Sequence, residues 1–261
     1  FNGVLEQYWG QNFFKLHTEY VGALVLPLAV LGLTDRDRGP VRWGFLAVLV
    51  LALLVAFGSH TPCYRAWYEI MPMMKKVRAP GMAFFLVAMS LALFAGFGTD
   101  RLMRRFAVTP VFAGLAFGIP AVLGLLGAVG ALQPIAEALA PAELMDRAVA
   151  NADALRAGGV RLLVVALLGT IAAVLIAGRR LKGFAAAAAL VSLVTLDLWS
   201  IDRQFFAFSA PAAELYAKDA ITERLSATPM PYRVLDPFPG TVYEHSILMG
   251  LGIPQVFGYH G

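Results

Sequence analysis

Long apolar runs separated by short charged connections constrain the fold of this chain more than any other feature. A helix needs about 20 mainly apolar residues to cross the hydrocarbon core of a bilayer. Six runs approach that length, and they cover residues 20–33, 43–58, 82–98, 110–131, 160–177 and 184–201. The first run is short unless its helix starts in the preceding aromatic residues. The pattern predicts an all-α polytopic membrane protein with about six transmembrane helices.

The composition agrees with a membrane protein. Hydrophobic residues make up 59% of the chain and charged residues 15%, and the mean hydropathy is +0.70, whereas soluble domains are about 45 to 50% apolar. A net charge of +4 is compatible with nucleic-acid binding, but the basic residues cluster beside the apolar runs, as topology signals do. We therefore expect no nucleic-acid partner. The single cysteine, Cys63, excludes an internal disulfide and offers no zinc or redox motif.

Basic residues predict the orientation of the runs. Nine cations lie in the three short connections that follow the first, third and fifth runs: Arg36, Arg38, Arg42, Arg101, Arg104, Arg105, Arg179, Arg180 and Lys182. Short loops rich in arginine and lysine stay on the cytoplasmic side. These connections should therefore be cytoplasmic, and both ends of the chain should lie outside.

The segments expected outside suggest two domains. Residues 1–201 would form a transmembrane bundle with outer loops at 59–81 and 132–159, and the second loop is Ala-rich with a helical pattern over 132–157. From residue 202 to 261 the chain becomes polar and Pro-rich, and RVLDPFPG and ILMGLGIPQVFGYHG predict short strands and turns. This part would begin a soluble extracytoplasmic domain. Since the chain starts without Met or a signal peptide, we expect an internal piece of a longer polypeptide.

Two ionisable side chains, His17 and Glu19, lie at the expected outer mouth of the first run. Ionisable groups at membrane depth are costly and usually face a cavity or a partner, whereas water removes that cost at headgroup depth. A substrate cavity and an ordinary interfacial turn both remain open. All four histidines fall on the expected outer side, but none has a partner at a metal-ligand spacing, so we expect no metal site.

Asp197 lies inside the last run, about one helical turn from its expected outer end. A carboxylate at that depth is a functional candidate, and we expect it to pair with Arg203 or with a cation of residues 59–81. A structural salt bridge or a helix-end hydrogen bond is the alternative.

Three cations of the first outer loop, Lys75, Lys76 and Arg78, are expected outside, against the positive-inside rule. General attraction to anionic headgroups, worth about 1 kcal/mol per cation, is one interpretation. The sharper one is a clamp for the phosphate of a lipid-linked donor. Arginine grips a phosphate with two parallel hydrogen bonds, and lysine adds a point charge.

Four stretches carry a family resemblance: EYVGALVLPLAVLGL, the loop from TPCYR to RAPGMAF running into AGFGTDRL, LDLWSID, and YRVLD with GIPQVFGYHG. In these stretches the chain resembles the YfhO-like bacterial membrane proteins. That family is similar to the GT-C type glycosyltransferases, which move a sugar from a polyprenyl-phosphate carrier to an acceptor on the outer face.

The resemblance implies a multi-pass protein of the bacterial cytoplasmic membrane. Its expected partners are membrane lipids, a polyprenyl-phosphate-linked sugar and a cell-envelope polymer or glycolipid acceptor, and no cofactor is expected. With the residues discussed above, the candidate site consists of a donor-phosphate clamp at Lys75, Lys76 and Arg78 and a substrate cavity lined by His17, Glu19, Tyr20, Asp197 and Tyr259. GT-C enzymes carry their catalytic carboxylate in the first external loop, which we expect to precede this chain. The catalytic residues stay unassigned, and the fragment alone is expected to be inactive.

Two other functions compete with sugar transfer. A transporter would have ionisable residues and broken helices near the middle of the membrane. A non-catalytic envelope scaffold would use the outer domain as its binding module. Sugar transfer from a labelled lipid-phosphate donor separates the first function from the other two.

Overall fold

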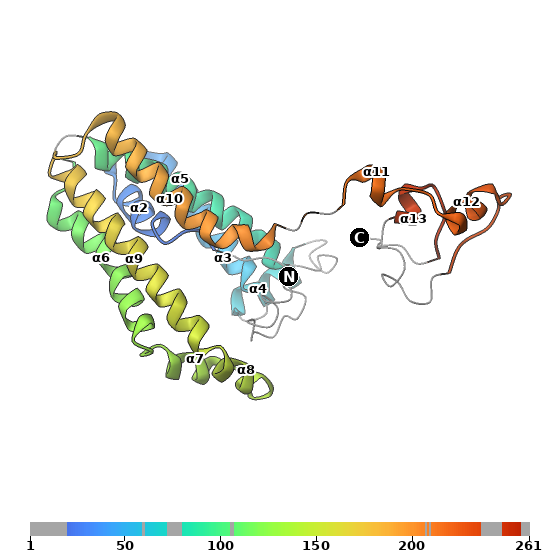
Figure 1. The fold of residues 1–261 in the computed structure, drawn as a ribbon. Helices are drawn as coiled ribbons and strands as arrows, with labels where there is room; N and C mark the ends of the chain where they lie inside the picture. Colours follow the sequence, from blue (N-terminus) through green and yellow to red (C-terminus); the bar gives the residue numbers. More distant parts are fainter. Residues whose placement is uncertain are drawn as a thin grey trace. The chain divides into compact units, whose positions relative to one another are not determined.

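The computed structural model describes residues 20–58, 61–71, 80–104, 107–206, 208, 210–235 and 247–256. The chain divides into two compact units, Phe1–Phe205 and Phe206–Gly261. Within the described ranges, the first unit consists of helices and the turns that join them (Figure 1).

Five helices in the described part of the first unit are long and apolar enough to cross a membrane. They are α3 (Gly39–Ala56), α5 (Phe84–Met103), α6 (Pro110–Ala128), α9 (Ala152–Ala177) and α10 (Gly183–Asp202). These helices confirm the fold class predicted from the apolar runs. The chain is an all-α polytopic membrane protein.

Local sequence signals start the spanning helices where apolar runs begin. At the start of α6, the Thr109 hydroxyl accepts a hydrogen bond of 3.2 Å from the Phe112 N–H. Pro110 occupies the first helical position, where its missing N–H leaves no hydrogen bond unmade. The turn after α9 contains Arg179 with a φ of 62° and Gly183 with a φ of 54°. These left-handed residues reverse the chain between α9 and α10.

The first expected run forms a short helix instead of a full span. Helix α2 (Val25–Leu33) has nine residues, which is too few to cross a bilayer. Six of them are buried: Val25, Pro27, Leu28, Ala29, Leu31 and Gly32. Helix α2 packs beside α5 (Figure 1). A short helix is tolerated at membrane depth when protein covers its ends.

Glycines let α2 and α5 approach closely. A Cβ atom on Gly32 would lie 1.9 Å from the carbonyl oxygen of Phe94, and one on Gly98 would lie 1.8 Å from the carbonyl oxygen of Leu28. Neither distance is sterically possible, so both positions require glycine. Such backbone contact between helices is typical of membrane proteins.

Helices α6 and α9 form a second close pair, and they run side by side in Figure 1. A Cβ atom on Gly159 would lie 2.4 Å from the carbonyl carbon of Gly127. Glycines at helix crossings thus bring together both helix pairs, α2 with α5 and α6 with α9.

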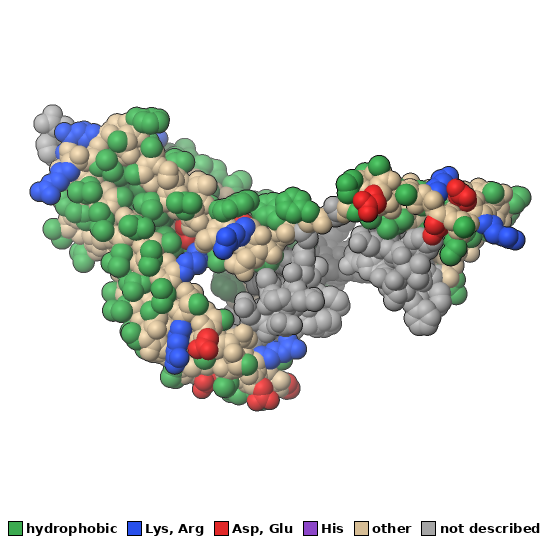
Figure 2. Space-filling view, in the orientation of Figure 1, with side chains coloured by type: hydrophobic (Ala, Val, Ile, Leu, Met, Phe, Trp, Pro, Cys, Tyr) green, Lys and Arg blue, Asp and Glu red, His purple; other side chains and the backbone are tan. Residues whose placement is uncertain are grey.

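Large apolar side chains stay exposed over the described part of the bundle. Val111 is 72% exposed, Leu115 65% and Phe184 89%. Figure 2 shows hydrophobic side chains spread over α6, α9 and α10. A monomeric soluble protein rarely exposes apolar surface so widely, whereas the hydrocarbon of a bilayer would cover it.

A cluster of ion pairs closes the end of the bundle where α2 stops. We call it the arginine–aspartate cluster, and its members are Asp35, Asp37, Arg38, Asp100 and Arg104. Arg104 binds Asp35 and, at 2.5 Å, Asp37, while Arg38 binds Asp100. Hydrogen bonding to Asp37 raises the pKa of the Arg104 guanidinium above its usual value. Asp35 is only 3% exposed, and its ion pair with Arg104 matches its buried charge.

Neighbouring arginines cap the last carbonyls of α2. Nη1 of Arg101 donates to the carbonyl of Leu31 at 2.9 Å and to the Thr34 hydroxyl at 2.6 Å. Nη1 of Arg42 donates to the carbonyl of Leu33 at 3.3 Å. These contacts supply donors to a helix C-terminus, where cations are favourable.

The connection between α6 and α9 is helical but shorter than the predicted loop of residues 132–159. It holds α7 (Gln133–Leu139), the 3-10 turn η5 (Ala142–Leu144) and α8 (Met145–Ala150). Helix α9 begins at Ala152, before the apolar run at 160–177. Helix α4 (Pro62–Ile70) lies in the other predicted loop, residues 59–81, and the Thr61 hydroxyl caps its start.

The prediction of short strands after residue 202 is wrong for the described residues of the second unit. They form α11 (Ala212–Leu215), α12 (Ala220–Ala227) and α13 (Ile247–Gly250), and one isolated bridge pairs Val234 with Gln255. Asp219 and Thr222 make a capping box that starts α12. The stretches predicted as strands lie after α12, and their described residues form α13 and the isolated bridge.

Candidate functional site

A group of polar residues lies where α2, α9 and α10 meet. We call it the Asp197 cluster, and it comprises the side chains of Tyr20, Arg161, Asp197 and Ser200 and the backbone N–H of Ala23. The Tyr20 hydroxyl donates to Oδ1 of Asp197 at 2.6 Å, and the Ala23 N–H donates to Oδ2 at 2.7 Å. Nη1 of Arg161 donates to Oδ1 at 2.9 Å. Both carboxylate oxygens therefore accept hydrogen bonds.

Asp197 binds the turn that leads into α2 from a distant part of the chain. Its side chain is 1% exposed, and its hydrogen bond to the Ala23 N–H reaches the turn before the first residue of α2. The partial positive charge of a helix N-terminus favours a carboxylate. A buried carboxylate at membrane depth is stable only when it is paired and hydrogen-bonded, and this one is.

The structure gives Asp197 a partner that the sequence did not indicate. We expected Arg203 or a cation of residues 59–81, but Arg161 makes the ion pair. Arg161 lies at the edge of the apolar run 160–177. Because α9 starts at Ala152, Arg161 is ten residues into the spanning helix. The signal that was missed is a cation inside a long helix.

Arg161 uses only one edge of its guanidinium in this cluster. Nη1 donates to Asp197 and, at 2.8 Å, to the Ser200 hydroxyl. The guanidinium carbon lies 5.0 Å from the centre of the Tyr20 ring, and the side chain is 28% exposed. A planar guanidinium can therefore bind a second anion through its remaining donors.

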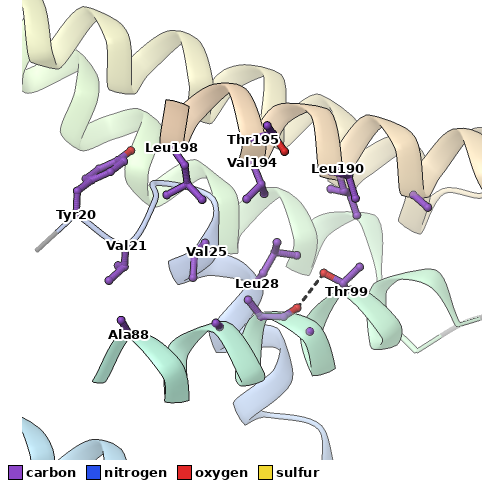
Figure 3. Close-up of a pocket in the computed structure, with 15 residues that line it drawn as sticks. Tyr20, Val21, Val25, Leu28, Ala88, Thr99, Leu190, Val194, Thr195 and Leu198 are labelled. Carbon is purple, nitrogen blue, oxygen red and sulfur yellow. Dashed lines mark hydrogen bonds between the residues drawn. The ribbon is translucent and has the colours of Figure 1, made fainter. Parts of the chain in front are cut away.

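An apolar groove of about 500 Å³ extends from Tyr20 between α5 and α10. The turn before α2 and α2 itself contribute Val21, Val25 and Leu28 (Figure 3). Small residues of α5 form one side, namely Ala88, Ala92, Ala95 and Gly96, and larger residues of α10 form the other, namely Leu190, Val191, Val194 and Leu198. A volume of 300 to 1,000 Å³ is about what ligand pockets have.

Three side chains with a hydroxyl group line the groove, namely Tyr20, Thr99 and Thr195. Figure 3 places Tyr20 at one end and Thr99 toward the other. The Thr99 hydroxyl donates to the Ala95 carbonyl at 2.9 Å, so this donor is used within α5. Tyr20 belongs to both the groove and the Asp197 cluster. The two features therefore meet at Tyr20, which adds a polar group to one end of the apolar groove.

The structure brings together two of the predicted site residues, Tyr20 and Asp197. His17, Glu19 and Tyr259 lie outside the described residues, as do Lys75, Lys76 and Arg78. Their roles stay predictions. Within the described ranges, no group of three or more His, Cys, Asp or Glu residues is arranged to hold a metal ion.

The fold and this site define a multi-pass helical membrane protein with an ion pair between its helices and an apolar groove along them. Comparison with protein-family models, with curated proteins and with solved structures found no match to the chain.

Proposed function

We propose that the chain is part of a glycosyltransferase-like protein of the bacterial cytoplasmic membrane. It would transfer a sugar from a polyprenyl-phosphate carrier to a cell-envelope polymer or glycolipid on the outer face. The supporting observation is the apolar groove between α5 and α10, which has the polar Asp197 cluster at one end. A polyprenyl-phosphate sugar has the same division into a long apolar chain and a polar head.

The groove suits a hydrocarbon chain because its walls are apolar and partly exposed. Val191 is 65% exposed, and Ala92 and Gly96 are also exposed on the α5 side. The exposed lining would let a chain enter from the bilayer without passing through water. The sequence resemblance supplies the sugar and the carrier. The groove supports only the binding of the hydrocarbon chain of such a carrier.

A leucine at Gly96 tests this function. A Cβ atom there has open space within 4 Å, and Gly96 lines the groove, so Gly96→Leu should fill the groove without straining the helix. The assay is sugar transfer from a labelled polyprenyl-phosphate donor in liposomes by the full-length polypeptide that contains this chain. We expect at least about a tenfold loss, since a well-fitting apolar chain would lose several contacts.

Gly118→Leu in α6 is the matched control. Its Cβ position is equally open, and Gly118 lies outside the lining of the groove, so transfer should be unchanged. Equal activity of both variants would contradict a role for the groove. Absence of transfer by the wild type with several donors would favour the scaffold.

Transport is the second candidate, and α2 favours it. A short helix whose N-terminal turn meets an ionisable cluster resembles the discontinuous helices at transporter binding sites. Uptake of a solute by protein in sealed liposomes, together with no sugar transfer, would support transport over the first proposal.

A further inference from the structure

Arg161 presents a partly exposed guanidinium beside its ion pair. Its Nη1 atom makes the contacts to Asp197 and Ser200, and the side chain is 28% exposed. A phosphate or carboxylate matches the fork of the guanidinium with two parallel hydrogen bonds.

The surroundings of Arg161 favour an anion. The Asp197 charge is already matched by Arg161, by the Tyr20 hydroxyl and by the Ala23 N–H. The N-terminus of α2 adds a partial positive charge beside the pair. With the Asp197 charge matched, the partial positive charge of this N-terminus favours an anion beside the pair.

Tyr20 connects this cation to the groove. Its ring lines the groove and also stacks with the guanidinium, whose carbon lies 5.0 Å from the ring centre. An amphiphile with its chain along Val21, Val194 and Leu198 would have its head near Tyr20 (Figure 3). The charge of Arg161 complements an acidic head at that place.

We propose that Arg161 binds the phosphate of an amphiphile whose hydrocarbon chain lies in the groove between α5 and α10. This proposal rests on the proposed function, because it assigns a second phosphate contact to the same lipid site. It differs from the predicted clamp at Lys75, Lys76 and Arg78 and concerns a residue inside the bundle.

The test measures binding without a sugar or an acceptor. The probes are labelled farnesyl phosphate and farnesol, which share one chain and differ in the phosphate, and the protein is the full chain purified in detergent. The wild type should bind farnesyl phosphate more tightly than farnesol. In Arg161→Lys, the affinity for farnesyl phosphate should fall at least about tenfold, because lysine keeps the charge for Asp197 but loses the fork. Farnesol binding should not change.

Arg156→Lys is the matched control, since Arg156 lies on the same helix, is more exposed and pairs with Asp153. Its binding of both probes should equal that of the wild type. If Arg161→Lys does not fold, Arg161→Gln combined with Asp197→Asn removes both charges together. The double variant should bind both probes equally.

Three results would overturn the proposal. In the first, a folded Arg161 variant binds farnesyl phosphate as tightly as the wild type does. Another is inorganic phosphate competing as strongly as farnesyl phosphate, which would indicate a site for the free ion. The third is equal affinity of the wild type for both probes. A phosphate preference that depends on Arg161, together with absent sugar transfer, would instead reject the proposed function alone.

Discussion

Asp197 joins three elements through one carboxylate. Tyr20 and Ala23 bind it from the chain leading into α2, and Arg161 binds it from α9. Removing the carboxylate would leave the Arg161 cation and two further donors without this partner. Loss of one member of a buried ion pair is more damaging than loss of both.

Asp197→Ala should therefore lower the free energy of unfolding by about 3 to 5 kcal/mol, because it leaves a partly buried cation unpaired. Asp197→Asn combined with Arg161→Gln should be less destabilising than Asp197→Ala. Thermal unfolding in detergent micelles measures both variants.

Asp153→Ala provides the comparison. The Asp153 side chain is 96% exposed and faces Arg156 at 3.5 Å, so its removal should change stability by no more than about 0.5 kcal/mol. If Asp197→Ala were as mild as this control, the carboxylate would not hold the three elements together.

At the scale of elements, the contact between α2 and α5 depends on the absence of side chains. Gly98 faces the backbone of Leu28 so closely that even a methyl group would meet a carbonyl oxygen at 1.8 Å. The two helices would have to separate to accept any larger residue. Since α2 contributes to the groove, their separation would also change its shape.

Gly98→Ala should destabilise the bundle by about 1 to 3 kcal/mol, the usual cost of overpacking. Gly96→Ala, two residues away on the same helix, should be neutral or slightly stabilising, because its Cβ position is open and alanine favours helix more than glycine. Thermal unfolding of the two variants side by side measures the difference. Equal stability would show that the close approach of α2 and α5 is not required.

At the scale of the whole molecule, the orientation in the membrane is a prediction from the basic connections. Asp146 in α8 and Arg180 after α9 are both exposed, and the pattern of cations puts Asp146 outside and Arg180 inside. In a Cys63→Ser background, an impermeant thiol reagent added to intact cells should label Asp146→Cys and spare Arg180→Cys. The reverse labelling would invert the topology.

Spanning helices were predictable because their length and apolarity are local properties of the sequence. The partner of Asp197 was not predictable. Arg161 lies in the predicted run 160–177, but the sequence does not show that it faces Asp197 on the next helix. The contact of Asp197 with Tyr20 joins residues 177 positions apart. No local pattern in one sequence reports such a contact, and the groove it borders depends on the same long-range packing.

The short length of α2 has a consequence for biogenesis. Nine residues are too few to be retained in the bilayer as an independent span, and the Ala23 N–H meets its acceptor 174 residues later in the chain. Synthesis at about 5 to 20 residues per second separates the two by roughly ten seconds or more. During that interval the segment must wait at the membrane surface or inside the insertion machinery. The hydrogen bond between the turn before α2 and Asp197 therefore forms late, after α10 has been inserted.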